Sequence, residues 1–170
     1  IPIYNEYYYI GKTLDSINNQ NKSTLSDALI VLIINNNKGC SKNIINNNYH
    51  TKQIILSKQY NFEYALLDYF SKGKALNNKE FGIGMIRKIG MDFTLQYSTP
   101  NSLLFCLDAD CIVPINYLET IIKHYKKHNF QAATINFKHQ KSTDPDIEYA
   151  ITTYEKELYN MAKKIKSLLK

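Results

Sequence analysis

Ala28-Leu29-Ile30-Val31-Leu32-Ile33-Ile34 decides the fold, because it is an unbroken apolar run between polar segments on both sides. A short run rich in Val and Ile is typical of a strand. Since no position in it is polar, both faces of this strand are expected to be covered. That is the pattern of a parallel sheet between two layers of helices. The sequence therefore predicts an α/β domain.

The segments around this strand predict alternating helices and strands, which favours a mostly parallel, Rossmann-like sheet with helices on both faces. Proline and asparagine turns separate most of them. The expected elements are a strand at Ile1–Tyr4, a helix at Tyr8–Asn19, a short helix at Asn43–Tyr49, a strand at Gln53–Ser57, a short helix at Phe62–Phe70, a helix at Gly82–Tyr97, strands at Leu103–Leu107 and Ala132–Phe137, a helix at Ile115–His128 and a last helix from Pro145.

Composition excludes some classes of protein. The chain has 170 residues, 44% of them hydrophobic, and a net charge of +6. The lysines are spread along the chain and no ladder of basic and aromatic residues occurs, so nucleic acid is not an expected partner. No apolar run is long enough to span a membrane. Three cysteines without a CxxC spacing predict free thiols and a cytoplasmic protein. We interpret Cys106 and Cys111 as small core residues.

An acidic pair ends the expected strand at Leu103–Leu107: Asp108-Ala109-Asp110 follows it directly. Carboxylates at the rim of a sheet suit Mg²⁺ or Mn²⁺, which also bind substrate phosphates. The alternative is an Asp-rich turn in which Asp110 caps the helix after Pro114. These residues alone leave the two interpretations level.

A glycine-rich helix start, Gly82-x-Gly84-x-x-Arg87, could bind an anion through backbone N–H groups and through the guanidinium. Arg87 is the only arginine among 21 basic residues, which indicates a task that needs a forked cation, although chance is the alternative. In an open α/β sheet, ligands bind outside the carboxyl ends of the strands. The segments that follow the strands are therefore expected to converge there.

Four motifs in this order resemble the family-two glycosyltransferases: Pro2-x-Tyr4-Asn5-Glu6, the strand that ends in Asn35 to Asn37, Gly82-x-Gly84-x-x-Arg87-Lys88-x-Gly90, and Leu107-Asp108-Ala109-Asp110. The resemblance implies the GT-A fold, with a nucleotide-sugar-binding domain at residues 1–137. Residues 138–170 would then be a loop and a long amphipathic helix that begins the acceptor side. The chain opens as if on the end of a strand, so we expect a truncated enzyme.

By this resemblance, the donor is a nucleotide-diphospho-sugar, most simply a UDP-sugar, and the acceptor is a glycan or a lipid-linked molecule. Asn36, or a neighbour in the same turn, stands where the family usually has an aspartate in the nucleoside pocket, which leaves the identity of the base open. The implied metal is Mn²⁺ or Mg²⁺ on the DXD motif, held by Asp110 with Asp108. The residues implied to bind the donor are Pro2, Tyr4, Glu6, Asn36, Gly84, Arg87, Asp108 and Ala109.

Transfer with inversion also needs a general base, which the sequence does not identify. Glu148 and Glu155 are late candidates, and we interpret both as solvated residues of the last helix. The alternatives are a non-catalytic nucleotide-sugar-binding module and a metal-dependent nucleotidyltransferase. The apolar stripe of the last helix is interpreted first as core or a docking surface. Peripheral association with the inner face of a membrane is the second interpretation.

Overall fold

A computed structural model describes residues 1–79 and 81–168. The chain forms two compact units, Ile1–Asn129 and Phe130–Lys170. The first unit contains the sheet and every residue predicted to bind the donor or a metal. The predicted division at residue 137 is a division by function, which these units do not test.

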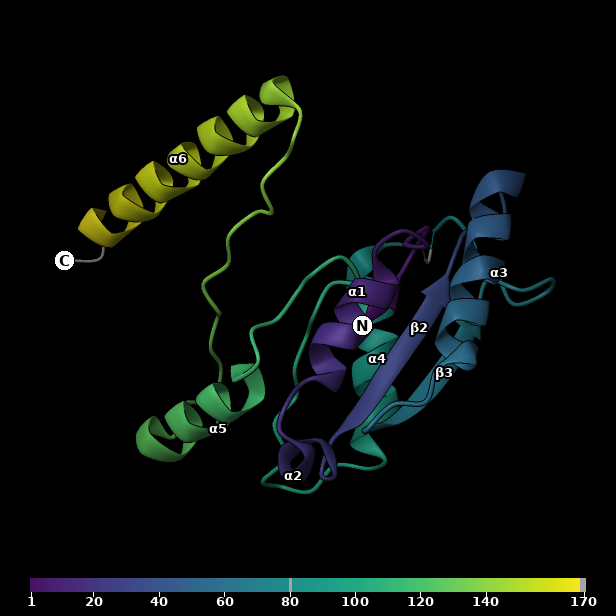
Figure 1. Cartoon of the computed structure of the whole chain (residues 1–170), viewed down its shortest axis with the longest axis horizontal. Coiled ribbons are helices and arrows are strands. Elements are labelled where there is room, and N and C mark those ends of the chain that lie inside the picture. Colours follow the sequence, from purple (N-terminus) through teal and green to yellow (C-terminus); the bar gives the residue numbers. More distant parts are fainter. Residues whose placement is uncertain (80, 169–170) are drawn as a thin grey trace. The chain divides into compact units, whose positions relative to one another are not determined.

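A three-stranded parallel sheet lies at the centre of the first unit, in the order β1-β2-β3. Its strands are β1 (Pro2–Ile3), β2 (Leu29–Asn35) and β3 (Glu63–Tyr69). Pro2 pairs with Ile33, and the whole of β2 pairs with β3. The apolar run that decides the fold is thus the middle strand, and Figure 1 shows it running between the helices.

Helices cover both faces of β2, as the apolar run predicts. Alternate residues of a strand point to opposite faces. Leu32 and Ile34 belong to the core cluster on the side of α1 (Ile10–Asn18) and α3 (Lys42–Ser57). Val31 and Ile33 belong to a second cluster with α4 (Ile83–Leu95), whose Ile86 is 1% exposed. The predicted α/β class with a parallel sheet is confirmed.

Gly90 explains how closely α4 packs on the sheet. A Cβ atom at this position would lie 2.7 Å from Cδ1 of Ile33, which is itself buried. Real Cβ atoms do not come so close to another carbon. Alanine in place of Gly90 would therefore force the end of the Ile33 side chain to move.

Two expected elements between β2 and α4 are wrong. The predicted helix at Asn43–Tyr49 is confirmed as part of α3, but the predicted strand at Gln53–Ser57 belongs to the same helix, which Ser41 caps by accepting the backbone N–H of Ile44. The predicted helix at Phe62–Phe70 is the strand β3. In both cases a short apolar run fitted the spacing of a helix as well as that of a strand, and packing against β2 and α1 decided which of the two formed.

The predicted strands Leu103–Leu107 and Ala132–Phe137 do not form among the described residues. Leu104 and Phe105 are 48% and 37% exposed, and Cys106 is exposed too, so the interpretation of Cys106 as a core residue is wrong. The neighbouring edge strand β1 has two residues, and one is Pro2, which has no N–H to donate. It offers little backbone with which another strand could pair.

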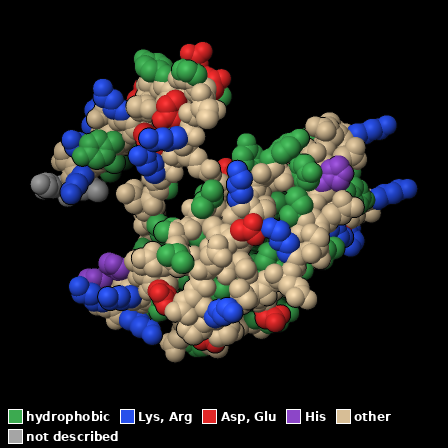
Figure 2. Space-filling view, viewed as in Figure 1, with side chains coloured by type: hydrophobic (Ala, Val, Ile, Leu, Met, Phe, Trp, Pro, Cys, Tyr) green, Lys and Arg blue, Asp and Glu red, His purple; other side chains and the backbone are tan. Residues whose placement is uncertain are grey.

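Two further helices belong to the first unit and one to the second. They are α2 (Lys22–Leu25), α5 (Tyr117–His128) and α6 (Pro145–Leu168). In the second unit the segment before α6 folds onto it: His139 donates its backbone N–H to Glu155 over 2.9 Å, and Ser142 donates to Glu148 over 2.8 Å. Among the described residues, no helix is long and apolar enough to cross a membrane. Figure 2 shows lysine and arginine side chains scattered rather than gathered in one patch.

Candidate functional site

The acidic pair lies in a turn that α1 holds in place. Thr13 donates its hydroxyl to the carbonyl of Ala109 over 2.7 Å, and Ala109 is 3% exposed. One turn further along α1, Ser16 accepts the backbone N–H of Val113 over 3.1 Å. Gln20 then donates to the carbonyl of Pro114 over 2.8 Å. With Ala109 anchored, the side chains of Asp108 and Asp110 remain exposed on the turn.

Arg87 contacts the acidic pair directly. Its Nη2 lies 2.6 Å from Oδ1 of Asp108, and the two side chains are 39% and 51% exposed. This hydrogen bond to Asp108 raises the pKa of the guanidinium further. Within the described residues the buried Nε of Arg87 has no hydrogen-bond acceptor, so Asp108 leaves the guanidinium partly unsatisfied. The structure thus brings together the glycine–arginine motif and the acidic pair, which lie 21 positions apart.

Glu6 contributes a third carboxylate to the same region. Its pKa is raised first by burial and then by the negative charges of Asp110 and Asp108. The turn after β1 and the turn that carries the acidic pair are therefore close enough to interact electrostatically. A region with such an excess of negative charge favours a cation.

Asparagines occupy the carboxyl ends of β1 and β2. Asn35 donates its side-chain amide to the carbonyl of Ile3 over 3.0 Å, which joins the ends of the two strands. Asn36 is 1% exposed and donates to Sγ of Cys40, while its Oδ1 has no partner among the described residues. Asn36 is therefore a buried amide at the strand end, where the family resemblance places the nucleoside pocket.

Aromatic rings lie beside the turn after β1. Tyr4 is 37% exposed, and its ring centroid lies 5.3 Å from that of Phe81 at an angle of 57°. Pro2 is buried within β1 itself. A Cβ atom at Gly84 would meet nothing within 4 Å, so crowding within the chain does not require glycine there. Whether a ligand requires it stays a prediction.

The acidic turn fits a divalent cation that is shared with a ligand. Among the described residues, no group of three or more His, Cys, Asp or Glu side chains could hold a metal by itself. Two carboxylates, Asp108 and Asp110, are nevertheless enough for Mg²⁺ when phosphate oxygens and water complete the shell. Their oxygens are hard donors and Glu6 adds negative potential, so the residues present suit Mn²⁺ or Mg²⁺.

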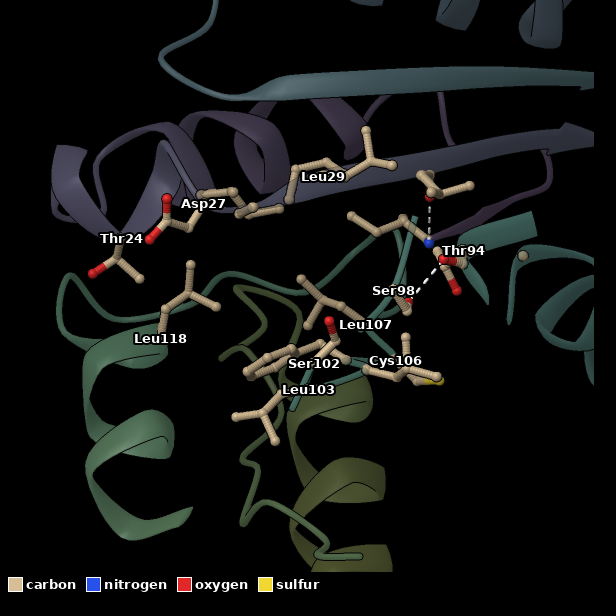
Figure 3. A pocket seen from close by; sticks show the side chains of 18 of the residues that line it. Thr24, Asp27, Leu29, Thr94, Ser98, Ser102, Leu103, Cys106, Leu107 and Leu118 are labelled. Atoms are coloured by element: carbon tan, nitrogen blue, oxygen red, sulfur yellow. Dashed lines mark hydrogen bonds between the residues drawn. The ribbon is translucent and has the colours of Figure 1, made fainter. Parts of the chain in front are cut away.

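A cavity of about 740 Å³ in the first unit reaches two of the predicted donor-binding residues, Pro2 and Arg87, but its lining does not include the acidic pair. Leu29 at the start of β2, Thr24 of α2 and Leu118 of α5 line it, with Leu103 and Leu107 opposite (Figure 3). Its lining runs along β2 from Leu29 to Ile33 and does not include the asparagines that end this strand. We interpret it as the space beside β1 that Leu103–Leu107 does not fill.

Sequence reasoning missed the residues that hold the site together, which are Thr13, Ser16, Gln20, Asn48 and Phe81. A signal existed for two of them. Thr13 is a polar residue on the buried face of α1, and Gln20 is a buried polar residue just after the end of that helix. Their partners are backbone atoms more than 90 positions away, which no local pattern reveals.

The fold and the site define an α/β domain with a parallel sheet and an acidic turn that Arg87 contacts. The sequence model of glycosyl transferase family 2 matches residues 1–169. The chain therefore belongs to glycosyl transferase family 2, and its three-stranded parallel sheet is consistent with the GT-A fold of that family. No curated protein and no solved structure matches the chain. Its general function is glycosyl transfer.

Proposed function

We propose that the first unit binds a nucleoside-diphosphate sugar at the carboxyl edge of the sheet and transfers the sugar, with inversion, to a glycan or a lipid-linked acceptor. The observation that carries this proposal is the contact between Arg87 and Asp108, which joins a forked cation to the acidic pair. Glu6 and Tyr4, from the turn after β1, lie on the same edge. UDP is the donor nucleotide that we test first.

Each group has a task in this proposal. The guanidinium of Arg87 binds a phosphate oxygen, because it presents several N–H donors in one plane. Tyr4 and Phe81 offer an aromatic surface to the base or the ribose. Asp108 and Asp110 would hold Mn²⁺ or Mg²⁺, which acts as a Lewis acid toward the leaving diphosphate. Thr13 keeps the acidic turn fixed while the donor enters.

The general base is not among the residues identified. Glu148 and Glu155 in the second unit both accept hydrogen bonds from the segment that folds onto α6. These contacts support a structural role for both. They also favour a second candidate function, a module that binds the nucleotide sugar without turning it over.

Thermal denaturation with a panel of nucleoside diphosphates, with and without Mn²⁺, tests the proposal. A ligand that binds only the folded state raises the melting temperature, by an amount that grows with its concentration over Kd. We expect UDP with Mn²⁺ to stabilise the wild type and to leave Asp110→Ala unchanged. Asp15→Ala is the matched control, because Asp15 is an exposed carboxylate of the same unit, paired with Lys58 at 2.8 Å.

Equal stabilisation of wild type and Asp110→Ala by UDP and Mn²⁺ would remove the metal role. The released product separates the classes of function. Free UDP from a UDP-sugar indicates glycosyl transfer, pyrophosphate from a nucleoside triphosphate indicates nucleotidyl transfer, and binding without either product indicates a binding module.

A further inference from the structure

We infer that Asn48, a buried residue of α3, is a positioning residue that fixes the donor-binding edge of the sheet. It is 0% exposed and lies on the face of α3 that packs toward the strand ends. Within the described parts of the chain its side chain bonds to Asn5 and Asn35 and not to the acidic pair or Arg87. The inference rests on the proposed function, since the edge that it fixes is the proposed donor site.

The side-chain amide of Asn48 joins the ends of two strands. Its Oδ1 accepts the backbone N–H of Asn5 over 3.0 Å, in the turn that follows β1. Its Nδ2 donates to the backbone carbonyl of Asn35 over 3.1 Å, at the end of β2. One amide group therefore satisfies a backbone donor of one strand end and a backbone acceptor of the other.

No other side chain of this shape can make both contacts. Aspartate keeps the acceptor but has no N–H to give to Asn35, and leucine has neither group. A buried backbone group that loses its partner costs free energy, because water cannot replace the partner there. Replacing Asn48 therefore affects the two strand ends before it affects the rest of α3.

The turn that Asn48 holds has an unusual backbone. Asn5 has φ of +62°, in the left-handed region that non-glycine residues seldom occupy. A second contact supports this conformation, since Asn47 donates its side chain to Oδ1 of Asn5 over 2.8 Å. Tyr4 and Glu6 flank Asn5 on either side, so the conformation of Asn5 sets where both side chains point.

The link to the site runs through the neighbours of the two residues that Asn48 binds: Tyr4 precedes Asn5 and packs against Phe81, and the buried Asn36 follows Asn35. If the turn relaxes, Glu6 and Tyr4 lose their fixed positions, while the acidic turn stays anchored by Thr13. Asn48 thus fixes the turn that carries Tyr4 and Glu6 relative to the acidic turn.

The test compares the Kd of UDP with Mn²⁺ among variants of the full chain, measured by calorimetry well below the melting temperature. We expect Asn48→Leu to weaken binding about tenfold or more, since both strand ends lose a buried hydrogen bond. Asn48→Asp should weaken it too, because its buried carboxylate can still accept the N–H of Asn5 but faces the carbonyl of Asn35 with no N–H to donate. Hydrogen exchange at the Asn5 amide should accelerate in Asn48→Leu and stay slow in Asn48→Asp.

Ile55→Val is the matched control for stability. Ile55 is also fully buried on α3, but its side chain belongs to the apolar core rather than to the strand ends. It should lower the melting temperature and leave Kd unchanged. A merely structural role for Asn48 predicts instead that Kd follows stability in all variants, and that result would overturn the inference.

Two further outcomes are distinguishable. If the wild type binds UDP and both Asn48 variants bind it equally well, the positioning role fails and the proposed function stands. If the wild type binds no nucleoside diphosphate, the proposed function fails and the positioning role fails with it. Should Asn48→Leu not fold, Asn48→Asp decides: its Kd must exceed that of Ile55→Val.

Discussion

Arg87 allows binding and stability to be separated in one experiment. The guanidinium contacts Asp108 at 2.6 Å, but the side chains are 39% and 51% exposed. Ion pairs with this exposure contribute about 0–1 kcal/mol, because solvent screens them. Arg87→Met should therefore lower the melting temperature by no more than about 4 °C, which is the shift that 1 kcal/mol gives in a chain of this size.

Donor binding should respond much more strongly. Hydrogen bonds to charged groups contribute about 1.5–3 kcal/mol, so losing the guanidinium should weaken UDP binding about 10- to 150-fold. Arg87→Lys keeps the charge and loses the fork, and we expect an intermediate loss of about three- to tenfold. Calorimetric titration with UDP and Mn²⁺ measures both variants, and thermal denaturation measures their stability.

Lys88→Met is the matched control, because Lys88 follows Arg87 on α4 and pairs with Asp92 instead of the acidic pair. It should bind UDP as the wild type does. Wild-type affinity in Arg87→Met would refute the reasoning. So would a loss of several kcal/mol in stability, because the arginine would then be a structural residue.

Two other predictions concern the fold. Gly90→Ala should destabilise by about 0–2 kcal/mol, since about 1–3 kcal/mol of overpacking on Ile33 opposes about 1 kcal/mol of helix propensity; Ile33→Val should relieve it, and strictly additive urea-denaturation energies would contradict the contact. Asp68 accepts hydrogen bonds from Ser71 and from the backbone of Phe70, and although burial opposes them, they leave its pKa below the usual value. The contribution of Asp68 to the free energy of unfolding should therefore be present above about pH 4 and disappear as pH falls through the lowered pKa. Asp68→Asn should lower the free energy of unfolding by about 1–2 kcal/mol at pH 7 and by progressively less in acid. A loss of stability that does not depend on pH would contradict this.

Helices and the central strand were predictable where the apolar residues fitted only a helix or only a strand. The run Ala28–Ile34 is too short for a helix and apolar at every position, so it had to be a strand with both faces covered. α1 and α4 were predictable from apolar residues at helical spacing. β3 was not, because Phe62, Ala65, Leu66 and Tyr69 fit a helix as well as a covered strand.

One contact of the candidate site was predictable from the sequence, but the residues that support the site were not. The order of the motifs indicated that Arg87 lies near Asp108, and the structure has the two in contact although the strand predicted before Asp108 does not form. Asn48 gave no such signal, because it is one of many asparagines in its segment. Its role depends on two backbone atoms at the ends of different strands, which only the folded chain brings within reach.

By itself, the sequence determined that this is an α/β protein whose motifs resemble those of the family-two glycosyltransferases. Periodicity, residue type and motif order are local properties, and they suffice for that. Only the tertiary structure decided which ambiguous segments became strands, that Gly90 lets α4 approach Ile33, and that Thr13 and Asn48 fix the two walls of the site. These outcomes depend on contacts between distant segments, whose free energy exceeds the small differences in local preference.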